Sequence, residues 1–509
     1  MFIPYAGIQN DEVAFVSPIY YPNPGYSLHV GHHFLPLMIQ SYAGTLKTYL
    51  YWPLIRNVPP RPFLIRSPML LAGALTIFLF FEFASTVAGP LAGLIGALLL
   101  ATDAIYLLTT TIDWGPVALQ HLLMVAGCIA IVRHRPAWGA FLFGLAMWDK
   151  AVYVWALAGL AAGTAVTCLP QVRRFIPDLK TAAQVAVAFL LGASPFLYYN
   201  VSHPNATLNS TGHVSLADLS QKVQELLVTA DGSGLFGYIA AEEASPQPKP
   251  AYTAPGRAAA WIRDHTGLHR TSYFPYAVLL SLLALPLWWR SPGRRAALFA
   301  IVFCIVTFAA MALTKGAGGA IHHTVLLWPF PQLFVGVALA AIRPQWICLT
   351  AAAAFALSNL LVMSQYMVQF ERNGPNGAFT DALNPLSAEL SDSAHDAIYV
   401  IDWGMFDNLV CLHRARLDLR PSSGPLVSAT PSADDQKEIA AMLRDPHALF
   451  LTHVTAREEF AGVGEHLKAF AKAAGYEQGP VRTIPDSNGR PVFELYRFQP
   501  KETDPSRRP

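Results

Sequence analysis

Two adjacent carboxylates, Asp11 and Glu12, are the strongest chemical signal near the start of this sequence. They lie in a stretch rich in proline, glycine and tyrosine, a composition typical of loops rather than of a buried helix. A carboxylate in such a loop can act as a general base towards a hydroxyl or an amine, while its neighbour orients the acceptor or binds a cation. Taken alone, the pair is more typical of a solvated loop or of a helix N-terminus, where acidic residues are favoured.

A third carboxylate, Asp113, follows the threonines at 109–111 and comes directly before an apolar segment. An aspartate in this place can simply cap the helix, with Pro116 just inside it. If the apolar segments cross a membrane in alternation, however, Asp113 falls on the same face as Asp11, and two converging acids are a stronger signal than either alone. Asp103 lies slightly deeper on the preceding segment and is a weaker candidate.

Cations follow the acids along the chain. A lipid phosphate or pyrophosphate needs such partners, with arginine as a bidentate fork and lysine as a point charge. Lys47, Arg61 and Arg66 can serve in this way, or they can anchor the chain to phospholipid headgroups. His322 and His323 begin a later apolar segment on the same face. Because adjacent residues on a helix point about 100° apart, the two histidines are not expected to bind one metal ion together. One of them can meet a phosphate or an acceptor, although histidines without a role are common at a membrane interface.

The composition explains where these groups lie. Of the 509 residues, 53% are hydrophobic and 13% are charged, whereas soluble domains carry about 25% charged residues. The shortage of charge falls between about residue 67 and residue 366, and the remainder of the chain resembles ordinary soluble sequence. We therefore predict a polytopic α-helical membrane protein with a soluble tail. The net charge of +2 and the lack of a Lys/Arg run give no indication of nucleic-acid binding.

Metal and disulfide chemistry find little support. The 5 cysteines form no CxxC or zinc spacing and are most simply small hydrophobic residues. His29 and His32 would share one face of a helix, but Gly31 and the prolines before it argue against a helix, and His33 adds no ligand geometry. We predict no metal site, and leave open a divalent ion bound among the acids.

Apolar segments that can span or enter a bilayer, which takes about 20 helical residues, follow one another through the middle of the chain. They are 67–85, 88–109, 114–132, 137–149, 150–168, 181–199, 274–290, 296–313, 325–342 and 345–366. The segment 137–149 is too short to cross alone and could form a half-depth hairpin with its successor. Asp149 and Lys150 lie at its turn, and charges at such depth usually face a cavity or each other.

Arginines and lysines in the short loops set the orientation, because they favour the cytoplasmic side. With alternating segments, these residues fall on one side: Arg133, Arg135, Arg173, Arg174, Lys180, Arg290, Arg294, Arg295 and Arg343. The exported side then receives residues 1–66, the long loop 200–273 and the tail 367–509. An exported first loop needs a signal, and none precedes Asp11, so we expect a membrane helix upstream of Met1.

Three regions follow from this reading. Residues 1–66 form an exported first loop with an interfacial helix at 34–55, and residues 67–366 form the transmembrane helix bundle, with short helices near 215–229 and 257–264 in its long loop. Residues 367–509 form a small soluble α/β domain. Its strands are expected at 397–403, 448–452 and 492–498, and its helices at 434–444 and 456–474. It contains no phosphate-binding glycine loop, so no catalytic work is assigned to it.

The order of these features resembles the C-type glycosyltransferase superfamily, in its bacterial branch related to protein O-mannosyltransferases and to lipid A aminoarabinose transferase. The resemblance covers roughly residues 1–366, and no single motif in it is diagnostic. It is carried by the following features in chain order: the Asp11-Glu12 loop, Gly44-Thr45-Leu46-Lys47, Arg66, Asp113, Gly144-Leu145-Ala146 with Lys150, the stretch Pro195 to Asn200, and the histidines 322 and 323.

The resemblance implies a membrane glycosyltransferase that moves a hexosyl or pentosyl group from a polyprenyl-phosphate donor to a lipid, glycan or protein acceptor. It implies Asp11 as catalytic base with Glu12 beside it, and Asp113 as an acid that orients the acceptor. The donor phosphate would be bound by Lys47 and, less closely matched, by Arg66, Lys150, His322 and His323. The active site and the tail would face the periplasm across the inner (plasma) membrane. The sequence departs from the family in lacking the helix before the Asp-Glu loop.

Other functions fit the same apolar segments. A multi-span transporter or a flippase for lipid-linked oligosaccharides would also need a membrane bundle, but transporters often show internal repeats and broken helices at the midplane. No repeat is evident here, and the polar residues gather towards one face. A ligase would share the phosphate-binding cations but use a pyrophosphate donor. Glycosyl transfer is therefore the first prediction, and transport or ligation the alternative.

Overall fold

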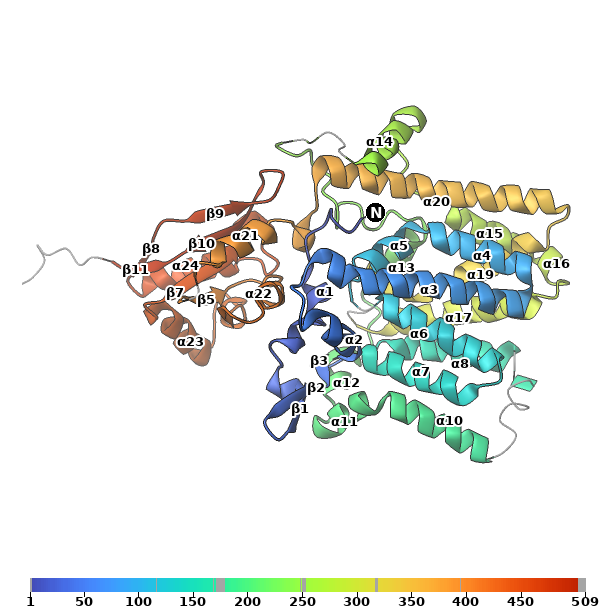
Figure 1. Ribbon diagram of the computed structural model, residues 1–509, viewed down its shortest axis with the longest axis horizontal. Coiled ribbons are helices and arrows are strands. Elements are labelled where there is room, and N and C mark those ends of the chain that lie inside the picture. Colours follow the sequence, from blue (N-terminus) through green and yellow to red (C-terminus); the bar gives the residue numbers. More distant parts are fainter. Residues whose placement is uncertain are drawn as a thin grey trace, which may run out of the picture.

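A bundle of long helices with a small α/β domain at one end makes up the computed structural model (Figure 1). It describes residues 2–115, 117–167, 169–170, 179–247, 249, 253–315, 319–393 and 395–501. Where the structure describes them, the predicted apolar segments lie mostly on helices. These are α3 (Pro62–Ala88), α4 (Pro90–Thr102), α5 (Ala104–Thr111), α6 (Val117–Val132), α7 (Pro136–Asp149), α8 (Tyr153–Thr167), α10 (Leu179–Gly192), α11 (Ser194–Ser202), α15 (Phe274–Leu283), α16 (Leu285–Trp288), α17 (Arg294–Leu313), α18 (Ile321–Thr324), α19 (Phe330–Ala340) and α20 (Gln345–Asn373).

Three helices of the described chain, α3, α17 and α20, are each long and apolar enough to cross a membrane, and up to 6 spans result if each bent pair counts as one. The bends are 59° between α4 and α5, 68° between α10 and α11, and 42° ahead of α19. Asp103 makes the first bend, because its side chain caps α5 by accepting from the Tyr106 N–H at 2.8 Å. A second oxygen of Asp103 accepts from the Trp328 indole at 2.8 Å, so this acid is a structural residue.

The helices α7 and α8 do not form the half-depth hairpin that the short segment 137–149 suggested. Instead α7 packs between α6 and α10, while α8 packs against α17. The chain turns from one helix to the other through Lys150, whose backbone forms a bridge with Ala43 of the first loop. The Ala151 N–H also donates to the Tyr42 carbonyl at 2.8 Å. The first loop therefore fixes the position of Lys150.

The first loop contains two short hairpins as well as helices. It runs through α1 (Asn10–Ala14), β1 (Ser27–Val30), β2 (His33–Pro36), β3 (Met38–Gln40), β4 (Ala43–Gly44) and α2 (Leu46–Ile55). The predicted interfacial helix at 34–55 is therefore wrong in its first part, where the chain pairs as strands. Pro36 and Gly44 disfavour a helix there. Gly44 also lies so close to α7 that a Cβ on it would be 1.8 Å from the Trp148 carbonyl oxygen.

The α/β domain is built on a five-stranded sheet of order β6-β5-β7-β10-β9. Its strands are β5 (Ala397–Val400), β6 (Asp418–Pro421), β7 (Ala448–His453), β9 (Arg482–Pro485) and β10 (Pro491–Tyr496). The strand β5 is parallel to both β6 and β7, and β10 is antiparallel to β7 and β9. The sequence predicted β5, β7 and β10 but missed the two edge strands and the small pair β8 (Tyr476–Gln478) and β11 (Phe498–Pro500), which are short and mostly exposed.

Alternate residues of the central strands bury against helices on opposite faces of this sheet, as the two-residue period of a strand requires. Ile398 and Val400 pack in one core, which includes residues of α21 (Leu383–Leu390) and α22 (Phe406–His413). Tyr399 packs in the other, with residues of α23 (Ala433–Arg444) and α24 (Val463–Ala473). The domain therefore has its own double-sided core.

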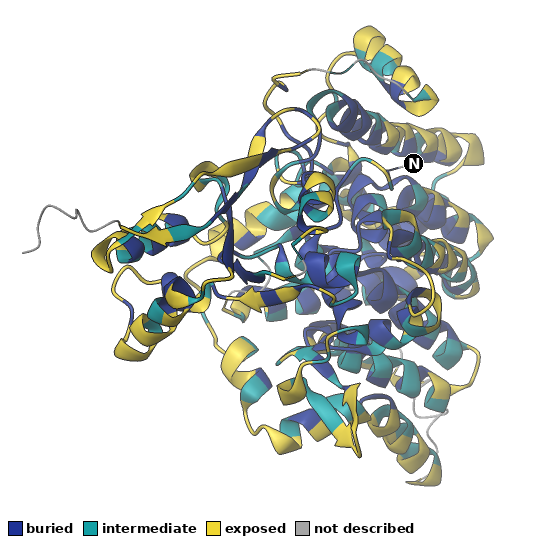
Figure 2. Cartoon of the chain, turned by 60° about the vertical axis from the view of Figure 1, so that its left-hand side comes forward, coloured by how far each residue is buried: buried dark blue, intermediate teal, exposed yellow. Residues whose placement is uncertain are grey.

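Direct hydrogen bonds join this domain to the first loop and to the loop 200–273. The Ser17 hydroxyl donates to Asp407 of α22 at 2.7 Å, and the Arg490 guanidinium donates to the Glu243 carbonyl at 3.1 Å. Figure 2 shows buried segments continuing from the bundle to this junction. The short basic links between α6 and α7, α16 and α17, and α19 and α20 lie at the opposite end of the bundle (Figure 1). The predicted basic residues Arg173 and Arg174 lie outside the described residues.

A fully buried guanidinium ties the first loop to the start of α3. Arg66 binds Glu12 in bidentate fashion, with its Nε 2.7 Å from Oε1 and its Nη2 2.8 Å from Oε2. The same group donates to the carbonyls of Ile3, Ala6 and Gly7 at 2.5, 3.0 and 2.7 Å. Glu12 also completes a capping box with Gln9 at the start of α1. The pair therefore sets the conformation of the segment that carries Asp11.

Replacing Arg66 by methionine leaves the Glu12 carboxylate buried without a counter-charge. Because breaking a buried pair in this way costs about 3 to 5 kcal/mol, we expect Arg66→Met to lower the thermal unfolding midpoint of the purified protein in detergent micelles. Arg61, whose side chain is exposed just before α3, provides the control. Equal midpoints for Arg66→Met and Arg61→Met would contradict the structural role of the pair.

Candidate active site

Asp11 lies in the first turn of α1, at the end of the bundle that carries the α/β domain. Lys150 is the charge that acts most strongly on its carboxylate, and Trp114 and Gln9 also lie close enough to act on it. Burial raises the pKa of the Asp11 carboxyl above its ordinary value, while Lys150, Trp114 and Gln9 oppose the rise. A carboxylate with a raised pKa, adjacent to a cation, is suited to accept a proton from a bound substrate.

Lys47 and Asp113 form a buried ion pair between α2 and the turn before α6, with side chains 0% and 2% exposed. Asp113 also accepts from the Ala118 N–H at 3.0 Å, so it caps α6 as well as pairing with the lysine. The Lys47 ammonium lies 4.8 Å from the centre of the Phe15 ring. Both readings of Asp113, helix cap and member of a charged cluster, are therefore realised together.

Lys150 and His322 flank the backbone of Gly115. This glycine has φ +68°, in the left-handed region, and a Cβ on it would lie 3.1 Å from the Lys150 ammonium nitrogen and 3.5 Å from Cδ2 of His322. The His322 ring packs on Trp114 with 4.3 Å between ring centres, whereas His323 meets Trp155 edge to face at 6.0 Å. One histidine therefore adjoins the Asp11 cluster, and a lysine and an imidazole are placed where a phosphate can approach the backbone of a glycine.

Asp149 is a member of this cluster that the sequence reading did not assign. It is 0% exposed, and neither carboxylate oxygen has a hydrogen-bond partner among the described residues. Asp113, Lys47 and Lys150 act on it electrostatically. The available signal was the pair of charges Asp149 and Lys150 at membrane depth, of which only Lys150 was given a role in the site. The cluster thus contains the carboxylates of Asp11, Asp113 and Asp149 against the ammonium groups of Lys47 and Lys150.

Other predicted site residues lie apart from the cluster. Glu12 and Arg66 bind each other and the backbone of the first loop, which leaves them in a positioning role. His29, His32 and His33 lie on the exposed hairpin of β1 and β2, which turns at Gly31 with φ +60°. In the described parts of the chain, no group of three or more His, Cys, Asp and Glu side chains is arranged to hold a metal ion.

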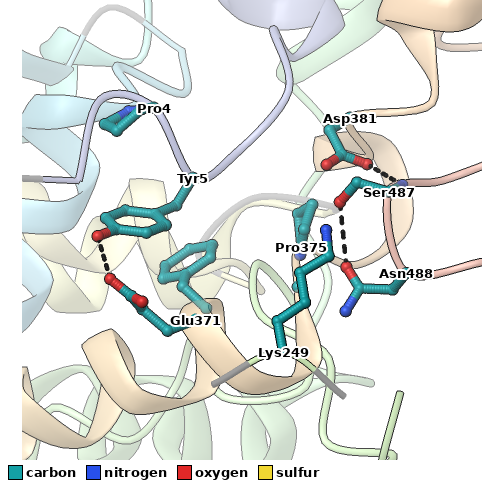
Figure 3. A pocket seen from close by; sticks show the side chains of 10 residues that line it. Pro4, Tyr5, Lys249, Glu371, Pro375, Asp381, Ser487 and Asn488 are labelled. Carbon is teal, nitrogen blue, oxygen red and sulfur yellow. Dashed lines mark hydrogen bonds between the residues drawn. The ribbon is translucent and has the colours of Figure 1, made fainter. Parts of the chain in front are cut away.

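A polar cavity of about 160 Å³ opens where the first loop, α20 and the β9–β10 turn meet. In Figure 3 the Tyr5 hydroxyl points to the Glu371 carboxylate, and Asp381 lies near Ser487 on the far side. Tyr5 and Thr253 both donate to Glu371. None of the lining residues belongs to the Asp11 cluster, so this cavity lies at a domain junction that is separate from the cluster.

No family model matches this chain, and no curated protein matches its sequence. Solved structures do resemble it. ArnT from Cupriavidus metallidurans bound to undecaprenyl phosphate superposes with a TM-score of 0.57 and 13% identity, over 96% of this chain and 94% of ArnT. Its apo state gives 0.55 and 13% over the same shares. An oligosaccharyltransferase from Archaeoglobus fulgidus, in complex with Zn and sulfate, gives 0.50 and 11%, over 97% of this chain and 69% of that one.

At this level of identity the likeness shows the fold. The match to ArnT extends over nearly the whole of both chains, so it includes the helix bundle, the first loop and the α/β domain. The predicted fold, a membrane helix bundle with a small α/β domain at one end, is confirmed by this likeness.

Proposed function

We propose that this protein is a membrane glycosyltransferase that moves a sugar from a polyprenyl-phosphate donor to a lipid, glycan or protein acceptor. The observation that carries the proposal is the Asp11 carboxylate beside Lys150 and next to the Gly115–His322 contact, at the end of the bundle beneath the α/β domain. The ArnT structure with the same fold was solved with undecaprenyl phosphate. A general base and a phosphate-binding cation are the two components that such a transfer requires.

In the proposed reaction Asp11 takes the proton from the acceptor hydroxyl or amine as that group attacks the anomeric carbon. The bond between this carbon and the phosphate oxygen breaks, and the leaving phosphate gains negative charge. Lys150 and His322 stabilise this charge more in the transition state than in the ground state, where it is smaller. A single displacement of this kind inverts the anomeric centre. The group transferred, on this proposal, is a hexosyl or pentosyl unit.

The remaining charged residues hold this arrangement. Asp113 orients the acceptor side of the cluster while its ion pair with Lys47 balances its charge, and Asp149 adds negative charge that keeps both lysines in place. Arg66 and Glu12 set the shape of the loop around Asp11 rather than binding the donor. A divalent metal is a possible further component, as in the oligosaccharyltransferase solved with Zn. The proposed reaction uses only side chains of this protein.

The proposal places the site on the exported side of the inner (plasma) membrane. The basic short links at the opposite end of the bundle support this orientation, because such residues favour the cytoplasm. The one-sided cluster also favours an enzyme over a transporter or flippase, whose substrate site lies near the midplane between repeats. A ligase with a pyrophosphate donor would differ in the donor it cleaves.

Replacing Asp11 by asparagine removes the proposed base while keeping the side chain's size. We expect the release of undecaprenyl phosphate from labelled undecaprenyl-phosphate sugars, measured with protein in lipid vesicles, to fall by about 10²- to 10⁴-fold. Asp434→Asn, on the exposed start of α23, is the matched control and should keep full activity. Release that survives in Asp11→Asn would assign the base to another carboxylate, with Asp113 the next to test.

The pH dependence follows from the raised pKa of Asp11. Only the deprotonated carboxylate can accept a proton, so the transfer rate should fall as the pH is lowered through a pKa above 3.8, the ordinary value of aspartic acid. Lys150 opposes this rise in the pKa most strongly, followed by Trp114, Gln9 and Lys47. In Lys150→Gln the acidic limb of the pH–rate profile should therefore move to higher pH. If the acidic limb stays at the wild-type pH in Lys150→Gln, Asp11 is not the group whose protonation lowers the rate.

A further inference from the structure

An aromatic pair leads from the Asp11 carboxylate towards solvent. Trp114, which lies close enough to act on the Asp11 carboxylate, stacks on Tyr238 with 4.8 Å between ring centres and 23° between planes. Phe379 closes the edge of Tyr238 at 5.6 Å. Although it is held by two rings, Tyr238 remains 45% exposed, so one side of it is available to a ligand.

A loop of the α/β domain is held rigidly near this pair. The Asp402 carboxylate, on a residue only 2% exposed, accepts from the backbone N–H groups of Glu459 at 2.8 Å and Phe460 at 3.0 Å. It also binds Nδ1 of His453 at 2.7 Å. A buried carboxylate with this many donors fixes the course of the chain, so the segment 454–460 is preorganised rather than free to move.

The same loop is connected to the segment that carries Tyr238. Arg457 lies 3.5 Å from the Asn376 side-chain oxygen, and Asn376 donates from its side chain to the Gly237 carbonyl at 2.7 Å. The Asn376 N–H donates to the Ile239 carbonyl at 3.1 Å. Asn376 thus binds the backbone on both sides of Tyr238, and Arg457 connects Asn376 to the α/β domain.

Glu459 is the charged group that this loop presents. Its side chain is exposed, and the described chain shows no ion pair or side-chain hydrogen bond for it. The carboxylates of both Glu459 and Asp11 act electrostatically on the Tyr238 hydroxyl. Tyr238 therefore lies within electrostatic reach of both the proposed base and an exposed acid of the α/β domain.

We propose that Tyr238 and Glu459 form an acceptor subsite for a molecule that carries a sugar ring. The apolar face of the ring would lie on the exposed face of Tyr238, while a ring hydroxyl would donate to the Glu459 carboxylate, which accepts hydrogen bonds and cannot donate them. The next hydroxyl would then lie towards Asp11. This inference rests on the proposed glycosyl transfer and makes the acceptor a glycan or the sugar headgroup of a lipid rather than a peptide.

The test uses the full chain in vesicles of phosphatidylethanolamine and phosphatidylglycerol, with a labelled undecaprenyl-phosphate sugar as donor. Octyl glucoside, below its micelle-forming concentration, and a serine-containing peptide are compared as acceptor probes. Donor cleavage without added acceptor and transfer to each probe are measured separately. The variants are Tyr238→Ala, Tyr238→Phe and Glu459→Gln. Glu465→Gln is the matched control, because Glu465 is an exposed acid on α24 that pairs with Lys468.

Octyl glucoside should be the better acceptor for the wild type. Losing a hydrogen bond to a charged group, or the stacking surface, should raise the KM for octyl glucoside by about tenfold in Glu459→Gln and Tyr238→Ala. Donor cleavage without acceptor should stay at the wild-type rate in the control Glu465→Gln, and Tyr238→Phe, which keeps the ring, should retain the wild-type KM for octyl glucoside. An unchanged KM in Glu459→Gln and Tyr238→Ala, or a preference for the peptide, would overturn the subsite.

Failure of the proposed function would give a different result, namely no donor cleavage by the wild type. The subsite is then tested by saturation-transfer NMR. This measurement reports binding of octyl glucoside to the protein in the same vesicles and requires no reaction. Binding that is lost in Tyr238→Ala and Glu459→Gln but kept in Glu465→Gln supports the subsite. Binding that is equal in all of these proteins overturns it.

Discussion

The buried pair of Arg66 and Glu12 is the interaction on which the rest of the site depends. An ion pair gains little from being taken out of water unless its remaining donors and acceptors are satisfied, and here the guanidinium also binds three backbone carbonyls while the carboxylate completes a helix cap. The result is a polar loop of defined shape seated on the first long membrane helix. Asp11 adjoins Glu12 in that loop, so the proposed base takes its position from a neighbour that performs no chemistry.

Charge balance explains the inner part of the site. Three carboxylates and two ammonium groups lie together where the bundle meets the first loop, and all of them are buried except the half-buried Asp11. Lys47 forms an ion pair with Asp113, and Lys150 is the cation next to Asp11 and Gly115. A phosphate arriving from the membrane adds further negative charge, so the lysine that adjoins the glycine backbone is the natural place for it.

Much of this arrangement could be predicted from the sequence, because sidedness is encoded locally. The apolar segments and the basic links between them fix which polar residues share a face, and this placed Asp11, Asp113 and His322 on one side. Lys150 was assigned to the site by the family resemblance. The ion-pair partners of the buried cations could not be predicted in that way. Nothing near Lys47 or Arg66 in the chain indicates that Lys47 would bind an acid beyond the next two apolar segments, or that Arg66 would bind an acid in the loop before it.

The missed elements have equally specific causes. Residues 34–45 alternate too briefly for a strand pattern to outweigh the apolar and aromatic character of the segment, and their pairing is completed by contact with α7. Asp149 was noted but given no role in the site, because its neighbour Lys150 offered the simpler phosphate-binding role. The α/β domain contributes no recognisable motif. Its connection to the site through Arg457, Asn376 and Tyr238 exists only in the folded chain.

The short connection between α20 and α21 has a consequence for the order in which the protein can assemble. Within it Gly374 and Asn376 bind the loop 200–273, and Phe379 accepts from the Gly7 N–H at 2.7 Å. Contacts between residues so distant in the chain form late, because the intervening segments must be ordered first. During synthesis the first loop can therefore make this contact only after α20 has entered the membrane. A chain truncated before residue 379 would carry Asp11 on a loop that lacks this hydrogen bond.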